Sequence, residues 1–360
     1  MTAATALMRR LDMRHPIIQA PLAGGSDTPA LVAAVGEAGG FGFLGAAYLS
    51  PEQIVEAGRA VRAKTARPFG INLFAPQPIP EAPPDMTRAL SGVAAYFSEV
   101  GLPAPTAPAR PKDGFAAQLA AALDTEASVV SVTFGLLADE AVAAIKGRGR
   151  SFVGTATTVA EARALERAGA DAVVAQGGEA GGHRGTFADG DFDAAQVGTM
   201  ALVPQVADAV KVPVIASGGI MDGRGIAAAL ALGAEAVQLG TAFLTCDEAG
   251  TPEAYKAAIL AAKETGTRVT RAFSGRPARG IVNRFMDEIE AAGDGTILPF
   301  PLQNALTRPL RTAANRQGRA EFLSLWAGQG LGLARRGPAG ALVARLAAET
   351  DAAIRRLGGA

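Results

Sequence analysis

The sequence predicts an α/β protein whose eight parallel strands alternate with helices and close into a barrel. Apolar runs and helical segments alternate eight times between His15 and Thr265. The runs are too apolar for one face to contact water, which is typical of parallel sheets covered by helices. A helix end, a glycine and a buried strand recur at residues 168–177, 232–241 and, more loosely, 38–45. Eight strands favour a TIM (β/α)8 barrel, and an open doubly wound sheet is the alternative.

Each expected strand is a short apolar run bounded by turn residues or by polar residues. The strands are His15–Pro21, Phe41–Ala47, Phe69–Phe74, Val129–Phe134, Ser151–Thr157, Ala172–Val174, Val212–Ser217 and Ala236–Gly240. The expected helices are Pro29–Ala38, Pro51–Lys64, Phe115–Leu123, Asp139–Lys146, Glu161–Ala168, one within Phe192–Val210, one from Asp222 to Leu232, and Pro252–Thr265. Ser50, Thr158 and Asp222 are expected to cap three of these helices.

Two regions depart from this alternation and predict a smaller cap domain. Proline-rich stretches flank a helical piece at 85–100, and the strand–helix pattern stops after Gly266. In the C-terminal region we expect helices at Ala313–Trp326 and Ala339–Leu357. The predicted organisation is therefore a barrel of residues 1–75 and 113–266, a cap of residues 76–112 and 267–345, and a C-terminal helix at 346–360.

Composition excludes several classes of protein. The chain has 360 residues, with 34 basic and 34 acidic side chains, which argues against a dedicated binder of nucleic acid or membrane surfaces. Its one cysteine, Cys246, excludes an internal disulfide framework and a cysteine-rich zinc site. The first residues lack the apolar core of a signal peptide, and no stretch is long enough to span a bilayer. We expect a cytoplasmic monomer or homodimer.

Small residues follow the last two expected strands. Gly218 and Gly219 end the seventh strand, and Gly240 and Thr241 end the eighth. Loops at these two positions of a barrel frequently bind phosphate through backbone N–H groups. The alternative is that both are only tight turns. We favour a phosphate site, because both loops carry small residues together.

Polar side chains stand at the expected strand ends and would converge on the barrel mouth. They are Asn72, Thr133, Thr155, Gln176, Ser217 and Gln238. Amides and hydroxyls in such a ring can hydrogen-bond the flat edge of a flavin or a nucleobase. Their common position predicts a ligand site rather than unrelated turns.

The loop after the sixth strand carries the candidate catalytic group. Residues 175–185 read AQGGEAGGHRG and contain one of the chain's two histidines, His183. A structural histidine needs packed apolar surroundings, which a glycine run does not provide, so we predict that His183 is a base or hydrogen-bond donor. Glu179 is expected to orient the loop through backbone N–H groups. His15, at the start of the first strand, is expected to be structural.

Other motifs are incomplete. Residues 40–45 satisfy G-x-G-x-x-G inside a strand, where it has no dinucleotide-binding context. Residues 189–193 resemble a calcium loop that lacks its glycine and its closing glutamate, so no metal is expected. Of the five arginines between Arg268 and Arg284, one or two could bind a substrate carboxylate if the cap covers the site.

Residues 176–185 resemble the signature of the nitronate monooxygenases, formerly called 2-nitropropane dioxygenases. Further stretches are similar in order and content, the last two being typical of the class I branch: 19–25, 71–74, 131–135, 216–220, 238–243, 299–304 and 325–330. Thr133 and Phe300 stand where some relatives carry histidine and tyrosine. The resemblance implies a TIM barrel that binds FMN and oxidises alkyl nitronates with O2 to carbonyl compounds and nitrite.

The resemblance also implies roles for individual residues. His183 would be the active-site base, and propionate 3-nitronate the physiological substrate. The implied cofactor-binding residues are Ala20, Pro21, Leu22, Asn72, Gln176, Gly181, Gly182, Ser217, Gly218, Gly219, Gln238, Gly240 and Thr241. FMN-dependent enoyl reductases share the EAGGH core, so an NAD(P)H-dependent FMN reductase acting on an enoyl thioester or quinone is the alternative. A non-catalytic flavin binder is a third hypothesis.

Overall fold

The computed structural model describes residues 4–78, 80–81, 83–109, 114–187 and 190–358. Its main sheet is a closed barrel of parallel strands in the order β1-β2-β3-β4-β5-β6-β8-β9, with β9 paired to β1. The strands are β1 (Ile17–Gln19), β2 (Phe41–Gly45), β3 (Phe69–Phe74), β4 (Val129–Thr133), β5 (Ser151–Ala156), β6 (Ala172–Gln176), β8 (Val214–Ser217) and β9 (Ala236–Leu239). Closure confirms the predicted TIM barrel and rules out the open sheet.

Helices cover the outside of the barrel, as the apolar strands require. They are α2 (Pro29–Glu37), α3 (Pro51–Arg62), α5 (Phe115–Leu123), α6 (Asp139–Gly147), α7 (Val159–Arg167), α8 (Thr199–Ala209) and α9 (Gly223–Ala231). Ser50, Thr158 and Asp222 accept hydrogen bonds from the first turns of α3, α7 and α9, so the three predicted caps are confirmed. A short helix, α1 (Ala6–Arg10), packs Leu7 and Met8 against the inner barrel residues and fills its N-terminal end.

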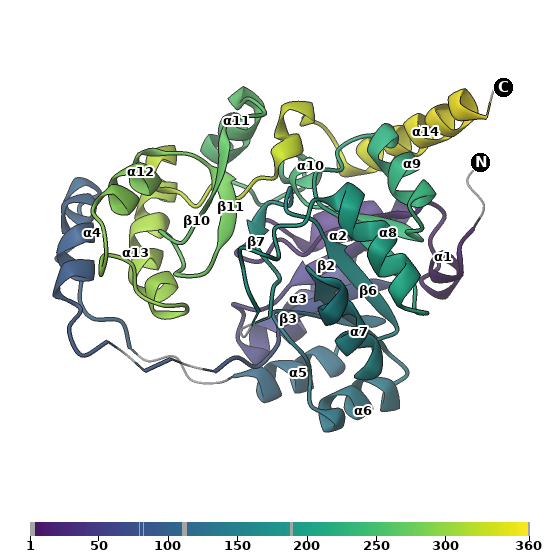
Figure 1. Cartoon of the computed structure of the whole chain (residues 1–360), viewed down its shortest axis with the longest axis horizontal. Coiled ribbons are helices and arrows are strands. Elements are labelled where there is room, and N and C mark those ends of the chain that lie inside the picture. The colour runs from purple at the N-terminus through teal and green to yellow at the C-terminus, as the bar shows by residue number, and fades with distance from the viewer. Residues whose placement is uncertain (1–3, 79, 82, 110–113, 188–189, 359–360) are drawn as a thin grey trace.

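The eighth outer helix is not the one that the sequence alternation predicts. Helix α11 (Glu253–Ala261) buries Tyr255 and Ile259 in the core of the cap. Helix α14 (Ala339–Leu357) instead packs against α9 and α2 (Figure 1). It runs unbroken across the boundary expected between residues 345 and 346. Sequence order suggests that α11 is the eighth outer helix, but in the folded chain the C-terminal helix α14 occupies that place.

The cap has a hydrophobic core of its own and lies beside the barrel mouth (Figure 1). It contains α4 (Thr87–Glu99), α12 (Arg284–Ala291), α13 (Leu302–Arg316), β10 (Thr267–Thr270) and β11 (Ala278–Ile281). The predicted helix at 313–326 is wrong: α13 ends before Gly318, whose φ of +67° is left-handed, and only a 3-10 turn (Ala320–Phe322) follows. Residues 79, 82 and 110–113 of the insertion lie outside the described residues, as do Asp189 of the rejected calcium loop and residues 359–360.

A three-stranded sheet joins the cap to the barrel. Its order is β10-β11-β7, and β7 (Gly182–His183) belongs to the glycine-rich loop that follows barrel strand β6. The antiparallel register places His183 opposite Ala278 and Gly182 opposite Arg279. In Figure 1 this sheet lies between the cap helices and the barrel. Among the described residues, no helix is long and apolar enough to cross a bilayer.

Candidate active site

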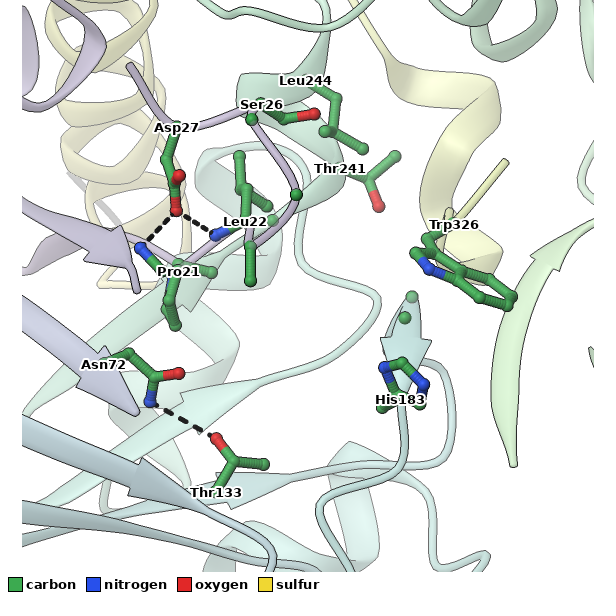
Figure 2. A pocket seen from close by; sticks show the side chains of 18 of the residues that line it. Pro21, Leu22, Ser26, Asp27, Asn72, Thr133, His183, Thr241, Leu244 and Trp326 are labelled. Carbon is green, nitrogen blue, oxygen red and sulfur yellow. Dashed lines mark hydrogen bonds between the residues drawn. The ribbon is translucent and has the colours of Figure 1, made fainter. Parts of the chain in front are cut away.

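A cavity of about 870 Å³ opens at the C-terminal ends of the barrel strands, under the cap (Figure 2). All the residues predicted for catalysis and cofactor binding line it, whereas Phe300 and the five arginines between Arg268 and Arg284 do not. From the β1, β3 and β6 ends come Ala20, Pro21, Leu22, Asn72 and Gln176; from the glycine-rich loop Gly181, Gly182 and His183; and from the β8 and β9 ends Ser217, Gly218, Gly219, Gln238, Gly240 and Thr241. Thr133 and Thr155 lie in the same wall.

The two glycine loops leave backbone donors open to the cavity. Gly218 and Gly219 adopt φ of +121° and +69°, conformations that favour glycine. Within the described part of the chain, the N–H groups of Gly218, Gly219 and Gly240 have no hydrogen-bond partner. The first N–H groups of α9 are not free, because the carboxylate of Asp222 caps them. The backbone donors that remain for a ligand are therefore those of the two glycine loops and not those of α9.

The amides at the strand ends divide into two kinds. Asn72 donates from Nδ2 to Ser131 Oγ at 2.9 Å, and its oxygen faces the cavity in Figure 2. The carboxamide of Gln176 is used within its own loop. Its Nε2 donates to the carbonyl of His183 at 3.1 Å, and its Oε1 accepts from Gly185 N–H at 2.8 Å. Gln176 thus holds the histidine strand in place as well as lining the cavity.

His183 has packed apolar surroundings, contrary to the expectation from the glycine-rich sequence around it. Rings of Phe74, Phe134, Phe300 and Trp326 lie 5.6–6.4 Å from the imidazole, measured between centroids. These rings come from β3, the end of β4 and the cap, so the local glycine run does not reveal them. Burial, followed by the charges of Arg276 and Arg311, lowers the pKa of His183 to about 3. The ring is therefore neutral at physiological pH, and its Nε2 lies 2.9 Å from Ser274 Oγ.

Buried polar bonds hold the glycine-rich loop. Arg184 is 1% exposed, and its two terminal nitrogens donate to the carbonyls of Gln176, Gly177 and Ala195 and to the side chain of Gln176. Glu179 accepts from the backbone N–H and hydroxyl of Thr199. Glu179 therefore orients the loop through a backbone N–H group, as expected. Arg184 had no predicted role, although an arginine that directly follows a glycine run is a usable sequence signal.

Two cap-side arginines act on the histidine, and only one of them, Arg311, had no sequence prediction. Arg311 lies in the cavity wall and donates from Nη2 to the carbonyl and side chain of Asn304, while its buried Nε has no partner. Arg276 stacks on Phe134, with its guanidinium carbon 3.9 Å from the ring centroid. Neither forms an ion pair with a described carboxylate. Arg276 belongs to the arginine-rich stretch that the sequence flagged, whereas Arg311 sits in a helical stretch without any motif.

Asp27 is a second cavity residue, after Arg311, without a sequence signal. Its Oδ2 accepts from the backbone N–H groups of Leu22 and Gly45, both at 2.6 Å (Figure 2). It therefore fixes the loop after β1 to the end of β2. Burial raises the pKa of this carboxyl to about 7, against the lowering effect of those hydrogen bonds. Among the described residues, no group of His, Cys, Asp and Glu side chains is arranged to hold a metal ion.

The fold and the cavity together define a TIM-barrel enzyme with a nucleotide-sized site beneath a cap. The nitronate monooxygenase family model matches residues 5–349. A probable nitronate monooxygenase of Staphylococcus aureus strain Newman is 41% identical over 340 residues, covering 94% of this chain and 95% of that protein. The chain belongs to the nitronate monooxygenase family and is an oxidoreductase.

Two solved structures share this fold. The nitroalkane oxidase from Streptomyces ansochromogenes has a TM-score of 0.91 at 45% identity, with 98% of this chain and 100% of that chain covered. FabK from Thermotoga maritima has a TM-score of 0.79 at 31% identity, with 99% of both chains covered. The barrel and the cap are thus shared over nearly the whole length.

Asp27 predicts a specific pH dependence of stability. The folded protein binds the Asp27 proton more tightly than the unfolded chain, so this group stabilises at low pH and the contribution is lost as pH rises through about 7. Asp27→Asn keeps an acceptor oxygen but does not titrate. Between pH 5 and 8, its free energy of unfolding in urea should fall less than that of the wild type. Identical pH dependence in the two proteins would contradict the assignment.

Proposed function

We propose that the protein is an FMN-dependent enzyme that oxidises alkyl nitronates with O2 to carbonyl compounds and nitrite. The observation that carries the proposal is the composition of the cavity. One side presents unpaired backbone N–H groups at two glycine loops, and the other presents a neutral imidazole on which the positive charges of Arg276 and Arg311 act. The first arrangement suits a phosphate, and the second suits an oxidisable anion.

FMN fits the residues that line the cavity. The volume of about 870 Å³ lies within the range of cofactor sites, roughly 300–1,000 Å³. The phosphate would be held by Gly218, Gly219, Gly240 and Thr241. The ring would be held by Ala20, Pro21, Leu22, Asn72, Gln176, Gly181, Gly182, Ser217 and Gln238. A side chain on Gly240 would fill space next to Leu22 and Ala20, where the ligand is expected. Bound FMN would supply the redox chemistry, and the protein supplies position and electrostatics.

His183 is the base for substrates that arrive as neutral nitroalkanes. A neutral imidazole can accept the α-proton, and the resulting nitronate is an anion. Arg276 and Arg311 favour that anion by the same charge that disfavours the imidazolium in the free protein. The nitronate formed beside the ring compensates this repulsion, because opposite charges at close range stabilise each other in a poorly solvated site. Substrates that arrive as nitronates need only to be held.

Propionate 3-nitronate is the substrate that we favour, with Arg311 as the partner of its carboxylate. Arg311 remains charged at neutral pH, although burial lowers its pKa to about 10. Its free Nε is buried in the wall of the cavity, and the exposed Arg308 adds a second positive charge nearby. A substrate with a carboxylate besides the nitronate would satisfy this guanidinium.

A second candidate is NAD(P)H-dependent reduction of an enoyl thioester or quinone. The EAGGH stretch at 179–183 favours it, because FMN-dependent enoyl reductases carry a version of the same sequence. No nucleotide-binding motif for a nicotinamide cofactor accompanies that stretch. The two candidates differ in their electron donor, and this difference decides between them.

The first experiment compares the two electron donors. The purified protein, supplied with FMN, should show a flavin absorption spectrum and should bleach under oxygen-free conditions when propionate 3-nitronate is added. NADH or NADPH under the same conditions should leave the spectrum unchanged on the time scale of turnover. Rapid bleaching by NADPH with none by the nitronate would establish the reductase instead. Failure to take up FMN at all would exclude both.

The second experiment tests the base. His183→Asn should lower kcat/KM for neutral nitroethane on the order of 10²–10⁴-fold, the usual contribution of a positioned base. The loss with preformed ethyl nitronate should be much smaller, because no proton has to be removed. His15→Asn, at the opposite end of the barrel, is the matched control and should leave both substrates unaffected. Equal losses with both substrates would contradict the base role.

The third experiment tests the carboxylate partner. Arg311→Gln should raise KM for propionate 3-nitronate about 10- to 100-fold relative to ethyl nitronate, since a hydrogen bond to a charged group contributes about 1.5–3 kcal/mol. Arg308→Gln is the comparison variant, and its effect should be small because exposed charges are screened by salt. An equal change for both substrates in Arg311→Gln would show that this guanidinium does not meet the carboxylate.

A further inference from the structure

We propose that Ser274 is a positioning residue that fixes the tautomer of His183, so that Nε2 carries the ring proton and Nδ1 is the basic atom. Ser274 lies between β10 and β11 in the cap and is 2% exposed. The proposal rests on the proposed function only where it assigns catalytic use to Nδ1. The tautomer itself follows from hydrogen bonding.

Three polar groups surround the hydroxyl oxygen of Ser274. It lies 3.0 Å from the carbonyl oxygen of Arg276, 3.2 Å from the backbone nitrogen of Arg276, and 2.9 Å from His183 Nε2. A hydroxyl has one hydrogen to donate and two lone pairs that accept. The three neighbours therefore use the full capacity of the group.

The roles of two neighbours determine that of the third. The Arg276 carbonyl has no hydrogen, so the Ser274 hydroxyl must donate to it. The Arg276 N–H donates to the first lone pair of Ser274. Only the second lone pair remains for His183, so Nε2 must carry a hydrogen and donate it. If Nε2 were bare, either the Ser274–His183 contact or the Arg276 carbonyl would lose its bond inside a buried turn, which is unfavourable.

The neutral ring has one proton, so Nδ1 is left with a lone pair. No described residue hydrogen-bonds to Nδ1, and His183 lines the cavity. In Figure 2 one ring nitrogen is turned to the open side, toward Pro21 and Asn72. The pairing of β7 with β11 and the bond from Gln176 to the His183 carbonyl hold the backbone. Ser274 lies between β10 and β11, and β11 pairs with the strand that carries His183. The same sheet therefore positions the imidazole and the Ser274 hydroxyl relative to each other.

Proton transfer then has a defined course. The Cα–H bond of a nitroalkane breaks, its electron pair forms the C=N bond of the nitronate with the negative charge on the nitro oxygens, and the proton bonds to Nδ1. The imidazolium so formed keeps its Nε2–H bond to Ser274 Oγ, so the hydroxyl need not reorient. Such a partner on the far nitrogen, which sets the tautomer of the reacting one, is a common arrangement around histidine.

Nitrogen NMR of ¹⁵N-histidine-labelled protein tests the tautomer directly. The chain has only two histidines, so His183→Asn identifies the signals of His183 by their loss. At neutral pH the purified holoprotein should show a protonated Nε2 and a bare Nδ1. Ser274→Ala removes the acceptor and should shift the tautomer ratio toward Nδ1–H by up to about tenfold, the usual worth of one neutral hydrogen bond. A protonated Nδ1 in the wild type, or an unchanged ratio in Ser274→Ala, would overturn the proposal.

Activity provides the second readout. Ser274→Ala should lower kcat/KM for nitroethane roughly tenfold and leave ethyl nitronate nearly unchanged, while Ser274→Thr restores both tautomer and rate. Equal losses with both substrates would show a purely structural role. Thr350→Ala, which removes a buried hydroxyl on α14, is the control and should change neither tautomer nor rates. If Ser274→Ala does not fold, the same measurements are made on Ser274→Cys, whose thiol is a weaker hydrogen-bond acceptor. If the wild type oxidises no nitronate, the proposed function fails while the NMR result still decides the tautomer.

Discussion

The segment from Gly181 to Gly185 belongs to the barrel and to the cap at once, and the site depends on this double attachment. On the barrel side, the buried Arg184 guanidinium binds three backbone carbonyls and the Gln176 side chain. On the cap side, Gly182 and His183 pair with β11. A cation that is 1% exposed has a large desolvation cost, which its hydrogen bonds to carbonyl oxygens offset. The imidazole is thereby fixed between two hydrophobic cores, and neither core alone determines its position.

The surroundings of the imidazole combine apolar rings with uncompensated positive charge. Phe134 is fully buried at a φ of +86°, a conformation that costs a non-glycine residue on the order of 1–3 kcal/mol. Its ring lies beside His183 and under the Arg276 guanidinium. Poorly solvated cations without carboxylate partners are unfavourable by themselves and become favourable once an anion is bound. The same environment keeps the histidine neutral and would favour a negatively charged ligand.

Much of the barrel and of its mouth could be predicted from the sequence, because the relevant signals are local. Each barrel strand is an apolar run of a few residues, and the parallel arrangement brings the polar residues at all strand ends to one edge. Asn72, Gly218 and Gln238 are far apart in the chain, yet they line one cavity for this reason. The register of β10, β11 and β7 could not be predicted in this way, because β7 is only two residues long and consists of glycine and histidine. The extended backbone of β7 depends on its pairing with β11.

The barrel, the three helix caps and the residues around the mouth could be predicted from the sequence, since periodicity, caps and glycine turns act over a few residues. The folded chain was needed to show that α14 rather than α11 completes the outer ring, and that aromatic rings and the charges of Arg276 and Arg311 act on His183. These features depend on contacts between segments that are far apart in the chain, such as Phe134 with Phe300. Burial and electrostatic potential are sums over such contacts, so no local pattern contains them.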